Sequence, residues 1–270
     1  MKAIVNVSVC ALLAKPTRES TLVDEALYGM VVEILEQPAE GWYKIRTHYR
    51  YEGYVCAGDL LTDGVNAWEA LPKKIVYHKN TCDVLAEPKV QGYFMQSVPR
   101  GGLVSPVGEA AEGWQKVRLA DGREGYMPAA ILAPYYDSPM SEHEPVLRQA
   151  LVDAALTYQG THYRWGGKSP LGIDCSGLGS MAYLLCGIII YRDADIKEGF
   201  PIREIPLDQM RAGDLIFFPG HVAMYMGNGR YCHSTAKDGD NGFTINSLDY
   251  RHPDYRADLK EKITQVGTFF

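Results

Sequence analysis

A loop meets a helix in the stretch Ile173-Asp174-Cys175-Ser176-Gly177-Leu178, and the second half of the chain is organised around it. Apolar residues then recur at helical spacing, at Leu178, Met181, Ala182, Leu184 and Leu185. Cys175 therefore stands at the N-terminus of a predicted helix, where the positive end of the helix dipole favours the thiolate. Because the thiolate is the nucleophilic form of cysteine, Cys175 is the candidate catalytic nucleophile.

Two histidines lie on a predicted β-hairpin downstream of this cysteine. The strand expected at 221–227 ends at Asn228-Gly229, a strong two-residue turn signal, and the residues that follow return as its partner. Because residues on paired strands interact, we expect His221 and His233 to lie close together. His221 is then the candidate general base, and His233 the residue that orients its ring. A metal site made of these histidines and Cys232 lacks a fourth ligand, so neither a metal nor a cofactor is predicted.

Further candidate site residues stand just before the nucleophile. Tyr163 and Trp165 belong to the segment Tyr163-Arg164-Trp165-Gly166-Gly167, which a short turn separates from the predicted helix. Both side chains have a second interpretation as core aromatics. Asp174 has the residue type and position of a helix N-cap, a role compatible with ligand binding.

Five pieces of sequence, taken in order, resemble the NlpC-type cell-wall cysteine peptidases, a compact papain-like family. They are Tyr163-x-Trp165-Gly166-Gly167, Asp174-Cys175-Ser176-Gly177, Gly213-Asp214-Leu215, His221-Val222 and His233. His221 follows Cys175 by 46 residues and precedes His233 by 12. The resemblance implies a papain-like domain with Cys175 as nucleophile, His221 as general base and His233 as the orienting third member.

The first half of the chain contains an internal repeat. The segment Glu40-Gly41-Trp42-Tyr43-Lys44-Ile45-Arg46 returns as Glu112-Gly113-Trp114-Gln115-Lys116-Val117-Arg118, at an offset of 72 residues. At the same offset, Glu52-Gly53-Tyr54 returns as Glu124-Gly125-Tyr126. Short predicted strands between Gly, Asp and Asn turns suit a small closed barrel in each repeat.

This pattern resembles the bacterial SH3-like domains that precede cell-wall hydrolases. We therefore expect an α+β protein in which SH3-like β-barrels occupy residues 1–64 and 65–137, the latter range including a linker. A papain-like cysteine peptidase domain follows over residues 138–270. Trp42 and Trp114 are interpreted as core aromatics of the barrels, and binding of wall polymer is the alternative interpretation.

The whole layout resembles the γ-D-glutamyl-L-diamino-acid endopeptidases, also called dipeptidyl-peptidase VI, and Leu27-Tyr28-Gly29 and Arg192-Asp193-Ala194 carry part of this likeness. The resemblance implies cleavage of murein peptides that begin with free L-Ala-γ-D-Glu, at the bond to the diamino acid. It assigns Tyr163, together with the backbone N–H of Cys175, to stabilisation of the oxyanion. The residues it assigns to substrate binding, including the free amine, are Asp174, Ser176, Tyr51, Glu25 and Trp165.

Composition narrows the possible partners. A net charge of −6 argues against binding of nucleic acid, which needs a basic surface. No segment approaches 18 consecutive apolar residues, so no membrane span is predicted. Residues 3–14 lack the uninterrupted apolar run and cleavage site of a signal peptide. We expect a cytoplasmic monomer that acts on a murein peptide, with secretion as the alternative.

Two other functions remain open at this level. The first is a non-catalytic wall-binding protein with an inert papain-like part, although a binder needs none of Cys175, His221 and His233. The second is amidase or acyl-transfer chemistry on the same fold.

Overall fold

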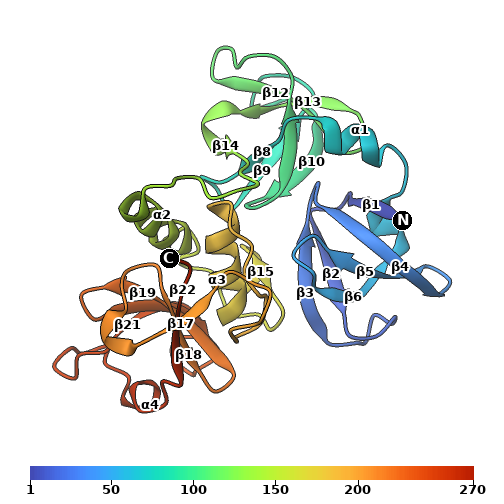
Figure 1. Ribbon diagram of the computed structural model, residues 1–270. Helices are drawn as coiled ribbons and strands as arrows, with labels where there is room; N and C mark the ends of the chain where they lie inside the picture. The colour runs from blue at the N-terminus through green and yellow to red at the C-terminus, as the bar shows by residue number, and fades with distance from the viewer. The chain divides into compact units, whose positions relative to one another are not determined.

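The computed structural model describes residues Met1–Phe270, which form two compact units, Met1–Tyr135 and Tyr136–Phe270. The first unit consists almost entirely of short antiparallel strands, and the second combines helices with one larger sheet (Figure 1). The predicted fold class, an SH3-like β region followed by an α+β domain, is confirmed.

The first unit contains two seven-stranded antiparallel sheets with the same strand order. The first sheet runs β3-β2-β6-β5-β4-β1-β7, and the second runs β10-β9-β13-β12-β11-β8-β14. A short helix, α1 (Val65–Ala70), connects them. The strands are β1 (Lys2–Val5), β2 (Val9–Leu13), β3 (Leu22–Leu27), β4 (Val31–Ala39), β5 (Trp42–Thr47), β6 (Glu52–Cys56), β7 (Leu60–Leu61), β8 (Lys74–Val76), β9 (Thr81–Leu85), β10 (Phe94–Pro99), β11 (Leu103–Pro106), β12 (Trp114–Arg118), β13 (Glu124–Pro128) and β14 (Leu132–Pro134).

The sequence repeat is also a repeat of strand register. Trp42 pairs with Cys56 in the first barrel, and Trp114 pairs with Pro128 at the same place in the second. Both tryptophans are half-buried, so they border the cores instead of filling them. The cores are aliphatic, because the alternate residues of each strand that face inward are mostly Val, Ile and Leu.

Tyr28 joins the two barrels into one unit. It leaves the first barrel after β3, is only 1% exposed, and packs in the apolar core of the second barrel. Its hydroxyl accepts a hydrogen bond from the Ala120 N–H at 2.9 Å, and its carbonyl accepts one from the Leu103 N–H at 2.8 Å. Gly29 follows at φ +78°, where an added Cβ would lie 2.5 Å from the Leu103 carbonyl oxygen. The segment Leu27-Tyr28-Gly29, which carries part of the resemblance to the γ-D-glutamyl-L-diamino-acid endopeptidases, therefore serves to pack the two barrels together.

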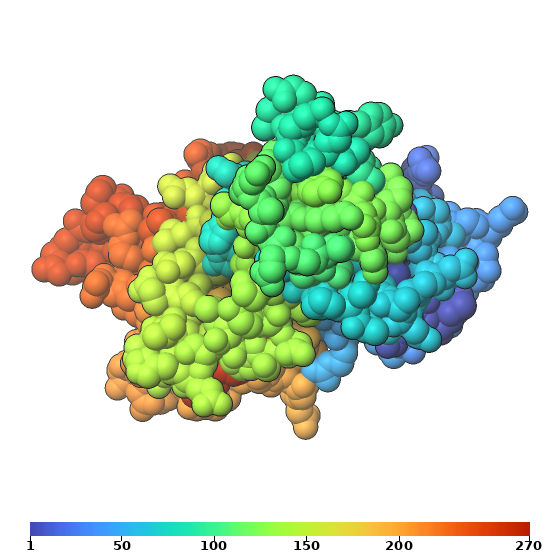
Figure 2. Space-filling model, turned by 90° about the horizontal axis from the view of Figure 1, so that it is seen from above, coloured from blue at the N-terminus to red at the C-terminus, as the bar shows by residue number.

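The second barrel presents one exposed apolar tip, the connection between β9 and β10. Val90, Tyr93 and Phe94 are all exposed there. The connection forms the teal projection in Figure 2, in which this barrel runs from cyan to green.

The second unit places two helices against a six-stranded antiparallel sheet of order β17-β22-β18-β19-β20-β21. Helix α3 packs on α2 and on strands β19 and β20. Helix α2 begins at Glu144, and His143 is its N-cap residue. The elements are α2 (Glu144–Leu156), β15 (Lys168–Ser169), β16 (Gly172–Ile173), α3 (Cys175–Leu185), β17 (Arg203–Ile205), β18 (Leu215–Phe218), β19 (His221–Gly227), β20 (Arg230–Thr235), β21 (Gly242–Ser247), α4 (Ala257–Lys260) and β22 (Gln265–Thr268).

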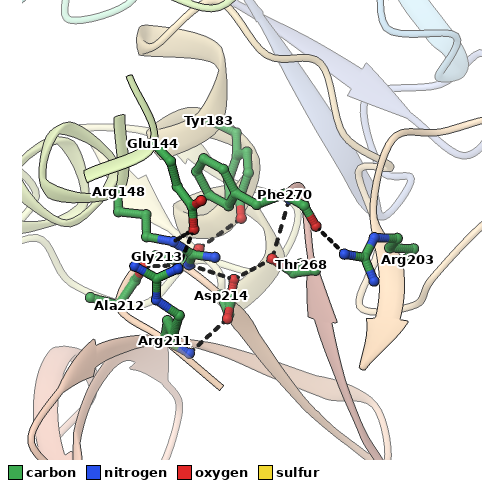
Figure 3. Close-up of polar contacts among 10 residues, drawn as sticks. All are labelled: Glu144, Arg148, Tyr183, Arg203, Arg211, Ala212, Gly213, Asp214, Thr268 and Phe270. Carbon is green, nitrogen blue, oxygen red and sulfur yellow. Dashed lines mark hydrogen bonds and ion pairs between the residues drawn. The ribbon is translucent and has the colours of Figure 1, made fainter. Parts of the chain in front are cut away.

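Asp214 fastens α2 to this sheet (Figure 3). Its fully buried carboxylate accepts hydrogen bonds from the Arg148 guanidinium at 2.9 Å, the Thr268 hydroxyl at 2.6 Å and the Arg211 N–H at 2.8 Å. Tyr183 of α3 donates to the neighbouring Gly213 carbonyl at 2.7 Å. The Gly213-Asp214-Leu215 motif is therefore structural, since a buried charge is tolerated only when it is paired in this way.

No helix in the structure is long and apolar enough to cross a membrane.

Candidate active site

The N-terminus of α3 holds Cys175 in place. Asp174 is the N-cap residue, and its carboxylate accepts the Gly177 N–H at 2.6 Å and the Gly166 N–H at 2.8 Å. Gly177 cannot be replaced sterically, because an added Cβ would lie 2.1 Å from the Gly167 carbonyl oxygen. The interpretation of Asp174 as a helix cap is confirmed.

The thiol of Cys175 is almost completely buried, and burial raises its pKa to about 11. Hydrogen bonds from the Val222 and Ser176 N–H groups act in the opposite direction but are weaker. The expectation that the helix N-terminus favours the thiolate is therefore wrong for the free protein, because desolvation of the sulfur outweighs the donors around it. The Val222 contact also places the sulfur beside the strand that His221 begins.

The two histidines are hydrogen-bonded to each other. The Nε2 atom of His221 lies 2.7 Å from Nδ1 of His233, and Nε2 of His233 lies 2.8 Å from Oδ1 of Asn246. The Asn228-Gly229 turn brings β19 and β20 together as predicted, with positive φ at both turn residues. The three side chains thus form a chain of hydrogen bonds that runs from β19 across β20 to β21.

Both imidazoles are held in the neutral form. Burial lowers the pKa of His221 to about 3 and that of His233 to about 4. The positive charge of Arg256 lowers both values further, and each histidine also feels a carboxylate that acts the other way, Asp174 for His221 and Asp258 for His233. At neutral pH the site therefore contains a thiol and two uncharged imidazoles, so His221 is able to accept a proton.

Tyr163 and Trp165 lie near the nucleophile in different environments. Burial raises the pKa of the Tyr163 phenol to about 12, and the charges of Cys175 and Asp174 act in the same direction. The hydroxyl therefore keeps its proton and can donate a hydrogen bond. Tyr163 also forms a β-bridge with Ile173, two residues before Cys175. Trp165 is 65% exposed, which rules out its interpretation as a core aromatic.

Sequence reasoning missed the partner of Asp174. Arg192 approaches both carboxylate oxygens of Asp174 at 3.1 Å and also donates to the Ser176 hydroxyl at 2.8 Å. Asp174 and Ser176, both predicted to bind the substrate amine, thus belong to one buried network with an internal positive charge. The likeness at Arg192-Asp193-Ala194 was the available signal, but spacing alone did not connect Arg192 with Asp174.

Tyr51 and Glu25 belong to the first unit. Glu25 lies on β3, and its carbonyl accepts a hydrogen bond at 3.1 Å from the hydroxyl of Tyr49, in the turn that also contains Tyr51. Tyr51 closes this turn through its N–H, which donates to the Thr47 hydroxyl at 3.0 Å. The two residues therefore lie in one region of the first barrel, and their roles toward a substrate stay predictions.

A small cavity of about 10 Å³ lies between α3 and the segment that follows it. It is lined by Ser176, Gly179 and Val222, and by Lys197 among the later residues. This volume is about that of a single water molecule, so no substrate side chain enters it in this conformation.

Comparison with known proteins gives a family. Residues 160–258 match the NlpC/P60 family, and residues 12–60 match the bacterial dipeptidyl-peptidase Sh3 domain. The chain is 46% identical to dipeptidyl-peptidase 6 of Lysinibacillus sphaericus, with 100% of both chains covered. It is 36% identical to the gamma-D-glutamyl-L-lysine dipeptidyl-peptidase of Bacillus subtilis (strain 168), over 36% of this chain and 34% of that protein. A crystal structure of an NlpC/P60 family protein from Bacillus cereus ATCC 10987 shares the fold, with a TM-score of 0.82 at 21% identity and coverage of 100% and 99%.

Fold and family together define a papain-like cysteine peptidase of bacterial cell-wall peptides. The chain belongs to the NlpC/P60 family and carries the SH3-like region of the bacterial dipeptidyl-peptidases ahead of its peptidase domain.

Proposed function

We propose that this protein hydrolyses the γ-D-glutamyl–L-diamino-acid bond of murein peptides that have a free N-terminal L-Ala. The observation that carries the proposal is the arrangement around Cys175, a thiol beside strand β19 whose first residue, His221, is hydrogen-bonded to His233. The full-length relative is named dipeptidyl-peptidase 6, and the partial relative is named for the γ-D-glutamyl-L-lysine bond. The first name supports release of a dipeptide, and the second supports the γ-D-glutamyl bond as the one that is cut.

The first chemical step is acyl transfer to sulfur. His221 takes the proton of the Cys175 thiol as the sulfur attacks the γ-carbonyl carbon of the D-glutamyl residue. A general base is needed because burial keeps the thiol protonated at neutral pH. The developing oxyanion is stabilised by the Tyr163 hydroxyl and the Cys175 N–H, which helix geometry leaves without an intrahelical acceptor.

The second step releases the products. The imidazolium of His221 protonates the departing amine of the diamino acid, leaving the L-Ala-γ-D-Glu thioester on Cys175. His221 then removes a proton from water, which attacks the thioester carbonyl, and the sulfur leaves as the L-Ala-γ-D-Glu acid is freed. The proton returns to sulfur, so the enzyme is regenerated without any cofactor in the balance.

Recognition of the free amine is the finer part of the proposal. A buried pocket that binds an ammonium needs a carboxylate or hydroxyl acceptors. Because Asp174 already pairs with Arg192, we propose that Glu25 and Tyr51 accept hydrogen bonds from the ammonium. Glu25→Gln is expected to raise KM for the free peptide while kcat changes little. Equal KM values for Glu25→Gln and the unmodified protein would remove Glu25 from this role.

The experiment that tests the reaction uses L-Ala-γ-D-Glu-L-Lys, its N-acetyl form, and the matching peptide with another diamino acid. We expect release of L-Ala-γ-D-Glu from the free peptides and no cleavage of the acetylated one. Cys175→Ala removes the activity, whereas Cys186→Ala, at another buried cysteine in the same unit, retains it. Turnover by Cys175→Ala would exclude the mechanism, and equal rates on free and acetylated peptides would exclude the amine requirement.

A further inference from the structure

The chain of hydrogen bonds from His221 does not end at His233. Asn246, on β21, is buried, and its Oδ1 atom lies 2.8 Å from Nε2 of His233. Strand register places Asn246 opposite Tyr231, two residues before His233 on β20, so the contact is diagonal across the strand pair. No motif in the sequence marks this residue, and the acyl-transfer steps above do not use it.

The orientation of the Asn246 amide is fixed from its other side. Its Nδ2 group donates to the Asp254 carbonyl at 3.0 Å, so the amide oxygen must face His233. An oxygen accepts only, and the Nε2 atom of His233 must therefore carry a hydrogen. In a neutral imidazole the other nitrogen, Nδ1, is then an acceptor.

The tautomer of His233 also determines the tautomer of His221. The His233 Nδ1 acceptor lies 2.7 Å from Nε2 of His221, so that nitrogen must donate. Neutral His221 consequently has its lone pair on Nδ1, the one ring nitrogen left to receive the thiol proton. The Asp254 carbonyl orients the Asn246 amide, and the amide in turn fixes the tautomer of His233. Through His233 it determines which ring nitrogen of His221 carries the lone pair.

We propose that Asn246 is a positioning residue that sets the tautomer of both histidines in this site. The inference rests on the proposed peptidase function for its kinetic consequence, but its structural content is independent of any substrate. An amide suits the task because it offers an oxygen to one neighbour and hydrogens to the other. It also adds no charge to the chain of hydrogen bonds.

The charged groups near His221 and His233 determine how a carboxylate at position 246 would change the pKa values of the two histidines. Arg256 lowers the pKa of both histidines, Asp258 acts against it at His233, and Asp174 acts against it at His221. Asn246→Asp would add an acceptor of the same shape with a negative charge, which favours the imidazolium. The acid limb of kcat/KM should then move to higher pH, while turnover near its optimum is largely kept. In contrast, Asn246→Leu has the size of asparagine but no acceptor.

The test combines kinetics with ¹⁵N NMR of the histidine rings in the whole protein. We expect hydrogen on Nε2 of both His221 and His233 in the unmodified protein, and a mixture of tautomers in Asn246→Leu. We also expect kcat to fall by about 10²-fold in that variant with little change in KM, since loss of a residue that fixes a catalytic tautomer costs this much or more. Thr244→Val, at the residue paired with His233 on the same strand, serves as the control and should leave tautomers and kcat unchanged.

Three results would overturn the inference: hydrogen on Nδ1 of His233 in the unmodified protein, unchanged ring tautomers in Asn246→Leu, or an acid limb unmoved in Asn246→Asp. If Asn246→Leu unfolds, the ring spectra of Asn246→Asp and of the unmodified protein still decide it. If the unmodified protein cleaves no murein peptide, the proposed function fails, and the tautomer pattern by itself tests the role of Asn246.

Discussion

Asp174 and Arg192 form a two-pronged ion pair, with both guanidinium contacts at 3.1 Å, at the N-terminus of the helix that carries the nucleophile. The same carboxylate caps the helix through the Gly177 N–H. The Asp174 side chain therefore determines the start of the helix and also holds Arg192, which follows the end of the helix at Leu185 by seven residues. The position of Cys175 depends on this pair.

Arg192→Leu is expected to destabilise the second unit by about 3–5 kcal/mol, because it leaves a buried carboxylate without its partner. Urea unfolding followed by fluorescence measures the change. Arg251→Leu, which removes an exposed ion pair with Asp249, should have no measurable effect. The double variant Asp174→Asn, Arg192→Leu should recover part of the loss. Equal stability of Arg192→Leu and Arg251→Leu would contradict the account.

Tyr163→Phe is expected to lower kcat by about 10²- to 10³-fold, because it removes one donor to the oxyanion. KM and the unfolding midpoint should change little. The phenol pKa of about 12 means that this donor keeps its proton throughout the accessible pH range. Tyr250→Phe, at an exposed tyrosine of the same unit, is the matched control. An unchanged kcat in Tyr163→Phe would remove the hydroxyl from the mechanism.

The buried histidines make stability depend on pH. Their pKa values in the folded protein, about 3 for His221 and about 4 for His233, lie below the ordinary value of 6.5. Below that ordinary value the unfolded chain binds protons that the folded one does not. The stabilisation is therefore complete above it and is lost as the pH falls toward the folded values.

The expected result is an unfolding midpoint that decreases as the pH is lowered from about 7 to about 5. Guanidinium titrations at several pH values in that range measure it. A variant with glutamine at both histidine positions should show a flatter dependence. A midpoint that stays constant across the range in the unmodified protein would show that the histidines titrate normally.

Tyr28→Ala is expected to destabilise the first unit by about 3–5 kcal/mol, because it leaves a cavity in the core of the second barrel. Tyr28→Phe loses only the bond from the Ala120 N–H and should cost about 1 kcal/mol. Thermal unfolding of the full chain measures both. Tyr93→Ala, at a side chain 77% exposed in the same unit, is the control. Similar melting of the two alanine variants would refute the packing role.

Much of the architecture was predictable because it depends on local signals. The offset of 72 residues predicts two barrels of the same construction. The strand pairing of Trp42 and Trp114 shows that the two barrels share the same register. The Asn228-Gly229 turn predicts the hairpin that brings the histidines together. In each case a pattern visible in the sequence is enough to predict the geometry, without knowledge of the tertiary packing.

The rest depends on contacts between distant residues. The pairing of Asp174 with Arg192 and the contact of Asn246 with His233 join elements whose spacing has no pattern. The thiol pKa was expected in the wrong direction because burial depends on everything packed around the sulfur, whereas the helix dipole is a local property. The exposure of Trp165 could not be predicted for a similar reason, since an aromatic residue type does not reveal which side of a loop faces solvent.

The carbonyl of Gly167, which occupies the place where a side chain at residue 177 would begin, has a practical meaning for anyone who diversifies this enzyme. Libraries aimed at new peptide specificities commonly randomise every position around a nucleophile. Here any side chain at residue 177 would force the backbone at Gly167 to move, at a cost in stability. Variation is better directed to Trp165, which is largely exposed, so that a replacement disturbs few neighbouring atoms.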